Sequence, residues 1–271
     1  GMTKDGIAEA FAEFARQENL SFFAQSAVKE LPPKGGYLFQ SRGYVCDSSA
    51  VALAERIDAE HFQPKFNALI DSLRAAGDCV RLGDYLLVNQ RGKQPEYVDE
   101  GLPVINSKHV LRNDVRLDED NRRAAAEGSS LKIQTGDVLI NGTGVGTIGR
   151  SAVYLHAEPA LPDNHVTILR TAKELDPVYL SVFLNSTAGQ LQVEQRLRGS
   201  SGQIELYPTD IAEFQIWLAP QAVQQAIRQQ VEDSFEQRRR AAQQLDAAKR
   251  AIEIAIEDSE AAARAFLESV A

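Results

Sequence analysis

Residues 135–155 read TGDVLINGTGVGTIGRSAVYL, in which two short apolar runs, Asp137–Ile140 and Ser151–Leu155, lie on either side of a glycine-rich segment. Runs rich in aliphatic residues between turn residues are typical of strands, and glycine allows the backbone conformations of a tight turn. The stretch therefore predicts a β-hairpin with its turn between residues 141 and 150.

Three glycines in this turn, at positions 144, 146 and 149, match the dinucleotide-binding pattern G-x-G-x-x-G. That pattern binds a pyrophosphate only when a helix begins at the third glycine. Here a strand-like run follows, which disfavours a dinucleotide site. Two interpretations remain. The turn is a plain connection, or it approaches DNA closely, with Asn141, Thr143 and Thr147 as hydrogen-bonding groups and Arg150 as a phosphate contact.

Further strand-like runs lie on both sides of the hairpin within residues 78–220, at Tyr85–Val88, Pro103–Ile105, His165–Leu169 and Phe214–Leu218. Helices are expected at Pro64–Ala76, ended by Gly77, and at Pro177–Gln195, with Asp176 as its N-cap. Because strands and helices do not alternate regularly, we predict an α+β domain with one mixed or antiparallel sheet. Residues 1–77 are interpreted as a helical lead-in.

Residues 221–271 contain neither proline nor glycine and are rich in residues that favour helix. From residue 227 to residue 266, apolar and small residues recur in alternating steps of four and three, the pattern of a heptad seam. We predict one continuous helix about 75 Å long. The short helix at 64–76 cannot cover such a seam, so we expect a partner helix, most simply in a homodimer. The apolar contacts would be Ile227, Val231, Leu245, Ile252 and Phe266.

A second polar cluster, Arg196-Leu-Arg-Gly-Ser-Ser-Gly-Gln203, follows the expected helix at 177–195. Arginine and glutamine side chains can bind guanine and adenine edges, and serine suits phosphates. The alternative is a solvated loop. The residues predicted to contact DNA from this cluster are Arg196, Arg198, Ser200, Ser201 and Gln203; Lys108 and His109 are expected to assist the hairpin.

Composition limits the function. The formal net charge of −9 argues against a protein that coats nucleic acid nonspecifically, but it is compatible with a small basic face. The two cysteines, Cys46 and Cys79, have no metal-binding or disulfide spacing, and no apolar run approaches the roughly 20 residues of a membrane span. We expect a cytoplasmic protein without a metal site, and no motif indicates a catalytic residue.

Residues 79–231 resemble the target-recognition domain of specificity subunits from type I restriction-modification systems. The segments that carry the resemblance occur in the order of the family: Val80–Asp84, Gly101–Ile105, Thr135–Ile140 with Gly146–Arg150, Tyr179–Ser186, Arg198–Gly202, and Leu218–Pro220 with Gln225 and Ile227. Each segment is weakly specific, but six in order before a long heptad helix form a specific pattern. A full specificity subunit has two such domains and two helices, so the chain resembles half of one.

The resemblance implies a subunit that reads one half-site of double-stranded DNA in the major groove and performs no catalysis. A separate modification subunit would methylate adenine N6 with S-adenosylmethionine, so this chain would bind no cofactor. In systems that also cut DNA, a motor-nuclease subunit would join them. The alternative function is a coiled-coil interaction protein that does not bind DNA, which the acidic charge favours.

Overall fold

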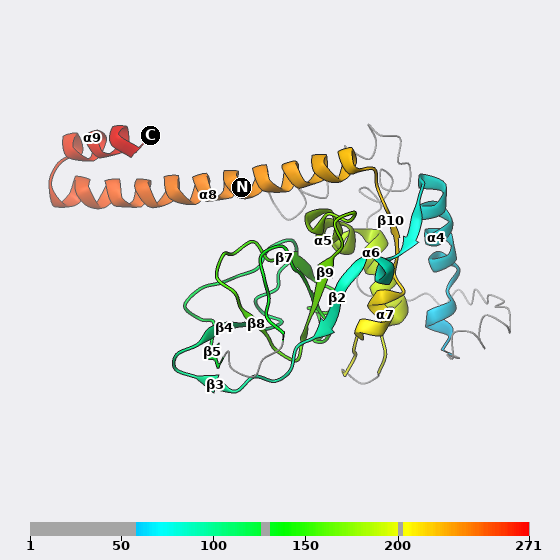
Figure 1. Ribbon diagram of the computed structural model, residues 1–271. Coiled ribbons are helices and arrows are strands. Elements are labelled where there is room, and N and C mark those ends of the chain that lie inside the picture. Colours follow the sequence, from blue (N-terminus) through cyan, green and yellow to red (C-terminus); the bar gives the residue numbers. More distant parts are fainter. Residues whose placement is uncertain (1–57, 126–130, 200–202, 271) are drawn as a thin grey trace, which may run out of the picture. The chain divides into compact units, whose positions relative to one another are not determined.

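The computed structural model describes residues 58–125, 131–199 and 203–270, which fall into two compact units divided between Gln221 and Ala222 (Figure 1). Most of the predicted lead-in lies outside the described residues. No helix in the described part of the chain is both long enough and apolar enough to cross a membrane.

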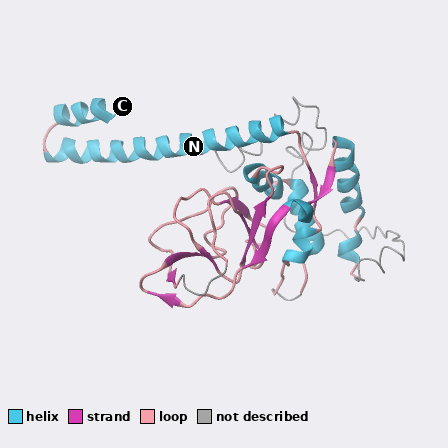
Figure 2. Ribbon diagram, in the orientation of Figure 1, coloured by secondary structure: helices cyan, strands magenta, loops and turns pink. Residues whose placement is uncertain are grey.

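The predicted hairpin belongs to the first unit, which combines strands, helices and loops (Figure 2). Its strands are β6 (Val138–Asn141) and β7 (Ser151–Val153), paired antiparallel with Ile140 opposite Ser151. They belong to a four-stranded sheet of order β2-β9-β6-β7, in which β2 is Leu86–Arg91 and β9 is Val166–Thr171. Every pair in this sheet is antiparallel.

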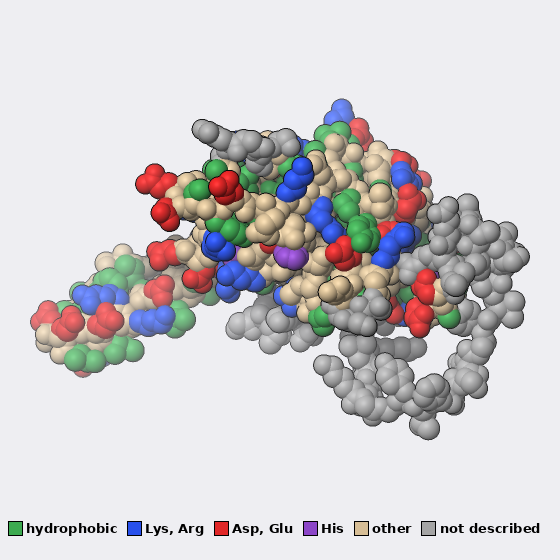
Figure 3. Space-filling view, turned by 90° about the horizontal axis from the view of Figure 1, so that it is seen from below, with side chains coloured by type: hydrophobic (Ala, Val, Ile, Leu, Met, Phe, Trp, Pro, Cys, Tyr) green, Lys and Arg blue, Asp and Glu red, His purple; other side chains and the backbone are tan. Residues whose placement is uncertain are grey.

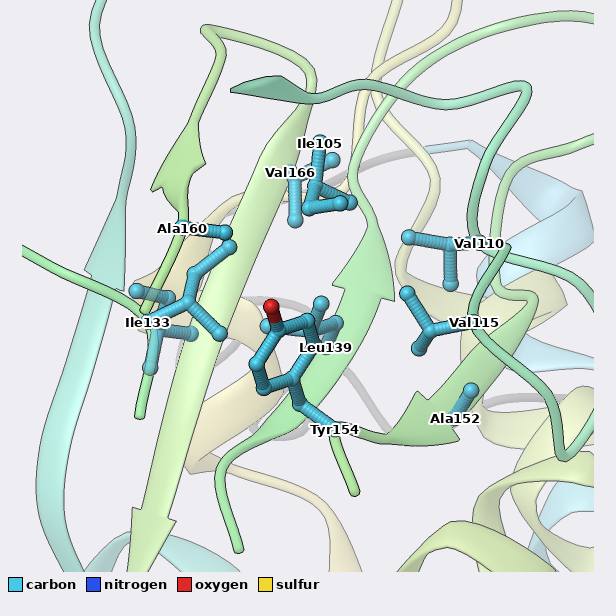
Figure 4. Close-up of a cluster of buried hydrophobic side chains, with 10 residues drawn as sticks. Ile105, Val110, Val115, Ile133, Leu139, Ala152, Tyr154, Ala160 and Val166 are labelled. Carbon is cyan, nitrogen blue, oxygen red and sulfur yellow. The ribbon is translucent and has the colours of Figure 1, made fainter. Parts of the chain in front are cut away.

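This sheet is covered on both faces, which explains why all four residues of β6 are buried. On one face, Leu139, Ala152 and Ile168 pack with residues from neighbouring loops around Tyr154, whose pKa is raised to about 12 by burial (Figure 4). Helix α5 (Pro177–Asn185) packs against β6 and β7, and all its residues from Val178 to Leu184 are buried. The hairpin therefore emerges from a closed apolar core.

A second four-stranded sheet has the order β3-β5-β4-β8. Its strands are β3 (Tyr97–Val98), β5 (Arg123–Ala124), β4 (Leu102–Ile105) and β8 (Leu161–Pro162), and only the β4–β8 pair is parallel. A two-stranded antiparallel sheet joins β1 (Cys79–Arg81) to β10 (Gln215–Trp217). Helices combined with these mixed and antiparallel sheets confirm the predicted α+β class, although the sheets number three in the described residues rather than one.

The helices of the first unit follow the predicted signals closely. α4 spans Pro64–Ala76 and ends at Gly77, whose φ is 145°, and Asp176 caps α5 by accepting hydrogen bonds from two backbone N–H groups. The helix predicted at 177–195 is divided, because Ser186 leaves the helical conformation and caps α6 (Thr187–Arg196). The short helices η1 (Ala59–Phe62), η2 (Leu82–Tyr85) and α7 (Pro208–Ala212) complete this unit.

The second unit corrects the prediction of one continuous helix. α8 spans Gln221–Glu257, about 55 Å, and a turn at Asp258 and Ser259 separates it from α9 (Glu260–Val270), which runs back along the end of α8 (Figure 1). The Ser259 hydroxyl accepts a hydrogen bond from the Ala262 N–H at 3.2 Å and so caps α9. A side-chain cap can end a helix without glycine or proline.

The fold-back of α9 covers one side of α8 and leaves another side open. Ala251 of α8 and Ala263 of α9 are only 5% and 6% exposed. Leu245 and Ile252 lie on a different face of α8, by the 100° rotation per residue of a helix, and are 58% and 62% exposed. Among the described residues of the second unit, no segment covers the part of the predicted seam that contains Leu245 and Ile252. Ile227 and Val231 are buried and Phe266 is half-buried.

Candidate nucleic-acid interface

The turn between β6 and β7 is a compact, internally hydrogen-bonded loop. Gly144, Gly146 and Gly149 all have positive φ angles, of 98°, 81° and 77°. The backbone N–H groups of Thr147 and Ile148 both donate to the Gly144 carbonyl at 3.0 Å. Strand β7 follows the third glycine, so the geometry required of a dinucleotide fingerprint is absent from this hairpin.

The two segments predicted to contact DNA lie side by side. Arg198 and Glu205 exchange two backbone hydrogen bonds, of 2.9 and 2.8 Å, which close the loop that contains the second polar cluster. The next residue, Leu206, donates its N–H to the Gly142 carbonyl at 2.8 Å, and Thr143 pairs with Glu205 in an isolated β-bridge. The sequence places these loops more than 50 residues apart, and the fold joins their bases directly.

Arg91 of β2 strengthens this junction. Its Nη2 donates to the carbonyl oxygens of Leu206 at 2.5 Å and Gly142 at 3.4 Å, and its Nη1 lies 3.3 Å from the Glu205 carboxylate. A hydrogen bond from the Tyr207 hydroxyl, followed by the contact with Arg91, lowers the pKa of Glu205. Arg91 therefore neutralises the acidic side chain at the junction and fixes both loops.

The turn at residues 106–110, which contains Lys108 and His109, lies against the base of the hairpin. Asn141 is fully buried, and its Nδ2 donates to the carbonyl oxygens of Ser107 at 3.0 Å and Thr147 at 3.3 Å. Lys108 is exposed, whereas His109 is only 2% exposed. The interpretation of Asn141 and His109 as surface contacts is therefore corrected: both are interior residues that support the loops.

The environment of His109 favours the neutral form of its imidazole. The Asn106 N–H and the Asn121 amide Nδ2 both lie near its Nδ1, at 3.1 and 3.2 Å, so Nδ1 accepts and the proton resides on Nε2. Burial, followed by the nearby positive charge of Lys108, lowers the pKa of His109. The ring is a buried brace for the turn that carries Lys108.

Two arginines, Arg112 and Arg150, lie near the end of the turn at which β7 begins. Arg112 donates to the Gln190 side-chain oxygen at 3.1 Å, and Gln190 in turn donates to the Gly149 carbonyl at 2.9 Å. Burial, followed by the positive charge of Arg150, lowers the pKa of Arg112. Within the described residues, neither Arg112 nor Arg150 forms an ion pair with an acid. Arg112 was missed by sequence reasoning because it lies outside both glycine-rich segments.

Of the remaining residues predicted to contact DNA, some form hydrogen bonds within the chain and others are exposed. The Thr143 hydroxyl lies 2.6 Å from His165 Nδ1, and the Thr147 hydroxyl donates to the Thr143 carbonyl at 3.1 Å. Arg196 donates to the Gln195 side chain and to the Glu213 carbonyl. Gln203 is exposed, and Ser200 and Ser201 lie outside the described residues.

Arg198 is held by an acidic side chain. Its Nε and Nη2 donate to the two carboxylate oxygens of Asp210 at 2.9 and 2.7 Å, and this interaction raises the pKa of Arg198. The Arg198 side chain is still 51% exposed. It is thus oriented by the fold but accessible from solvent.

The arrangement offers backbone groups, hydroxyls and local positive charge, the set of groups that binds phosphates and base edges. On the face viewed in Figure 3, Lys and Arg side chains lie among hydrophobic and acidic ones, with a histidine near the middle of the view. In the described part of the chain, no group of three or more potential metal ligands is close enough to hold an ion.

Comparison with known proteins gives similarities among solved structures alone: no family model and no curated protein matches the chain. One similar chain comes from a study of complex assembly and conformational transition of the type I R-M system, with a TM-score of 0.47 and 16% identity over 97% of this chain and 56% of that chain. The HsdS subunit from Thermoanaerobacter tengcongensis has a TM-score of 0.43 and 18% identity over 82% of this chain and 54% of its own length.

The S subunit of a type I restriction-modification system from M. genitalium has a TM-score of 0.47 and 15% identity, over 71% of this chain and 48% of its own length. These three solved structures are all described as parts of type I restriction-modification systems, and two of them are S subunits. This chain spans about half the length of these solved chains. The activities and partners of those longer proteins therefore remain proposals for this chain.

Proposed function

We propose that this chain reads one half-site of double-stranded DNA for a type I-like restriction-modification system. The observation that carries the proposal is the junction between the β6–β7 hairpin and the loop closed by Arg198 and Glu205. Glycine-rich backbone can approach a groove closely, and hydrogen-bonding side chains in the two loops suit base edges. Two such loops on one rigid base form a reading surface.

Local charge supports the same function. Lys108 lies near the first end of the β6–β7 turn and Arg112 and Arg150 near the second, and in the described part of the chain none of them forms an ion pair with an acid. Phosphate contacts release counterions and supply most of the sequence-independent affinity for DNA. With a net charge of −9, the rest of the chain would repel DNA, which restricts binding to this surface.

We propose further that the chain is not itself the catalyst. It would position a separate modification subunit that methylates adenine N6 and holds the S-adenosylmethionine, and a motor-nuclease subunit where the system also cuts DNA. The resemblance of residues 79–231 to target-recognition domains supports this division of roles. The sequence motifs for catalysis are missing as well.

The exposed face of α8 supports a partner helix. Leu245 and Ile252 are more than half exposed on a helix that otherwise has the heptad pattern of a coiled coil. We propose that a second copy of the chain pairs with α8, antiparallel as in the paired helices of a full specificity subunit. The same exposed face would serve a protein without DNA-binding function, so the DNA experiment must decide between the two functions.

The deciding experiment measures binding of the chain, assembled with its modification subunit, to a randomised DNA duplex library across a salt series. The expected result is salt-dependent binding with sequence preference. Arg150→Ala and Arg112→Ala should each weaken binding to all sequences alike and reduce the salt slope by about one unit. Lys173→Ala is the matched control, because Lys173 is exposed beyond the far end of β9.

Two results would contradict the proposal. Binding that is absent or insensitive to salt would favour the interaction-protein alternative. Binding in which the two arginine variants behave like Lys173→Ala would place the DNA surface elsewhere. Thermal unfolding of each variant separates a change in binding from a loss of fold.

A further inference from the structure

An apolar side chain occupies the tip of the β6–β7 turn. Val145 is 74% exposed, between Gly144 and Gly146 with their positive φ angles. Its neighbours in the turn are glycine and threonine, and a valine at this position gains nothing from burial within the chain. Ile148, the other apolar residue of the turn, is half-buried, so Val145 is the apolar side chain that the turn exposes. Its position at the tip indicates a contact with an apolar group of a ligand.

The turn holds Val145 in a defined position. The Gly144 carbonyl accepts two backbone hydrogen bonds, and the Thr147 hydroxyl donates to the Thr143 carbonyl. One end of the turn is fixed to Leu206 by the Gly142 carbonyl, and the other end is fixed to α6 through Gly149 and Gln190. A valine side chain has a single χ1 torsion, so little conformational entropy is lost when it forms a contact.

We propose that Val145 reads the C5 methyl group of thymine in the major groove. This inference rests on the proposed function, the reading of a DNA half-site. Among the groups that the base edges present in the major groove, the thymine methyl is the apolar one, and an apolar side chain is its natural contact. Arg112 and Arg150, both near the end of the turn at which β7 begins, would bind phosphates and bring the tip of the turn to the base edge.

The test compares two randomised duplex libraries, one with thymine and one with uracil in its place, which removes only the methyl group. The wild-type chain with its modification subunit should prefer thymine at one position or more of its half-site. At that position, replacing thymine with uracil should lower the affinity about four-fold, which is the factor expected for one buried methyl group. Val145→Ala should bind both libraries equally at that position.

Leu87→Ala is the matched control, because Leu87 is 70% exposed at a bulge in β2 and lies at the opposite end of the sheet from the turn. It should discriminate thymine from uracil as the wild type does. The inference is overturned if the wild type treats the two libraries alike, or if Val145→Ala still discriminates.

A Val145→Ala variant that weakens binding to both libraries equally would instead indicate a wedge between bases, and would also overturn the inference. If the wild type binds neither library, the proposed function itself fails, and the inference fails with it.

Discussion

Asp210 accepts hydrogen bonds from both the Nε and the Nη2 atoms of Arg198, so the guanidinium group lies in the plane of a carboxylate that is almost buried. This geometry gives Arg198 a structural role in addition to the base contact predicted from sequence. We expect Arg198→Ala to lower the free energy of unfolding by about 1 kcal/mol, because half of the Arg198 side chain is exposed and solvent screens the pair.

A double-mutant cycle with Arg198→Ala and Asp210→Asn measures this interaction directly. Arg116 and Asp118 form a more exposed pair at 3.5 Å and provide the control cycle, for which we expect a coupling energy near zero. Equal coupling energies in the two cycles would show that the bidentate geometry adds nothing.

Asn141 is the second candidate contact with a structural role. We expect Asn141→Ala to destabilise the chain by about 2 kcal/mol, because the change leaves buried carbonyl oxygens without a donor. Urea unfolding of the variant, compared with Asn67→Ala at an exposed position of α4, checks this prediction. DNA binding should fall along with stability, since the hairpin loses its connection to Ser107. If Asn141→Ala unfolds like the wild type but fails to bind DNA, Asn141 is a direct contact after all.

The buried His109 predicts a pH dependence of stability. Its folded pKa is lowered from the ordinary value of 6.5, so below pH 6.5 the unfolded chain takes up a proton that the folded chain does not. The free energy of unfolding should therefore fall as the pH decreases from 6.5 toward the folded pKa, and should be unaffected by this group above pH 6.5.

Chemical unfolding at a series of pH values tests this prediction with His109→Gln, which should remove part of the acid destabilisation. His156→Gln is the control for loss of a histidine elsewhere in the same unit. A wild type and a His109→Gln variant with parallel stability profiles between pH 7.5 and 5 would disprove the role of His109.

Local sequence signals predicted most of the fold. The N-cap Asp176, the terminal Gly77 and the aliphatic runs of β6 and β9 indicated their elements because each depends on nearby residues. The two-residue strands β3, β5 and β8 were not predicted, since pairing between distant segments creates them.

The structure brings the two predicted loops together, and it buries some of the residues that were predicted to contact DNA. The two loops were identified because glycine and polar residues are conspicuous in sequence. Burial, in contrast, depends on tertiary packing, and it placed His109 and Asn141 inside. The helix break at Ser259 was missed for a related reason: serine in an alanine-rich segment has the same local pattern whether it continues a helix or caps the next one.

The open face of α8 gives the last prediction. We expect the wild-type chain to associate through Leu245, whose side chain is 58% exposed, and we expect Leu245→Asp to shift it toward the monomer, because a charge at the centre of a helix pair loses its hydration. Gln243→Asp adds the same charge two residues away, on the opposite side of the helix, and should leave association unchanged. Light scattering over a range of concentrations measures the mass, and circular dichroism confirms that both variants remain helical. A wild type that is monomeric at all concentrations, or two variants that associate equally, would mean that this face of α8 does not bind a second copy.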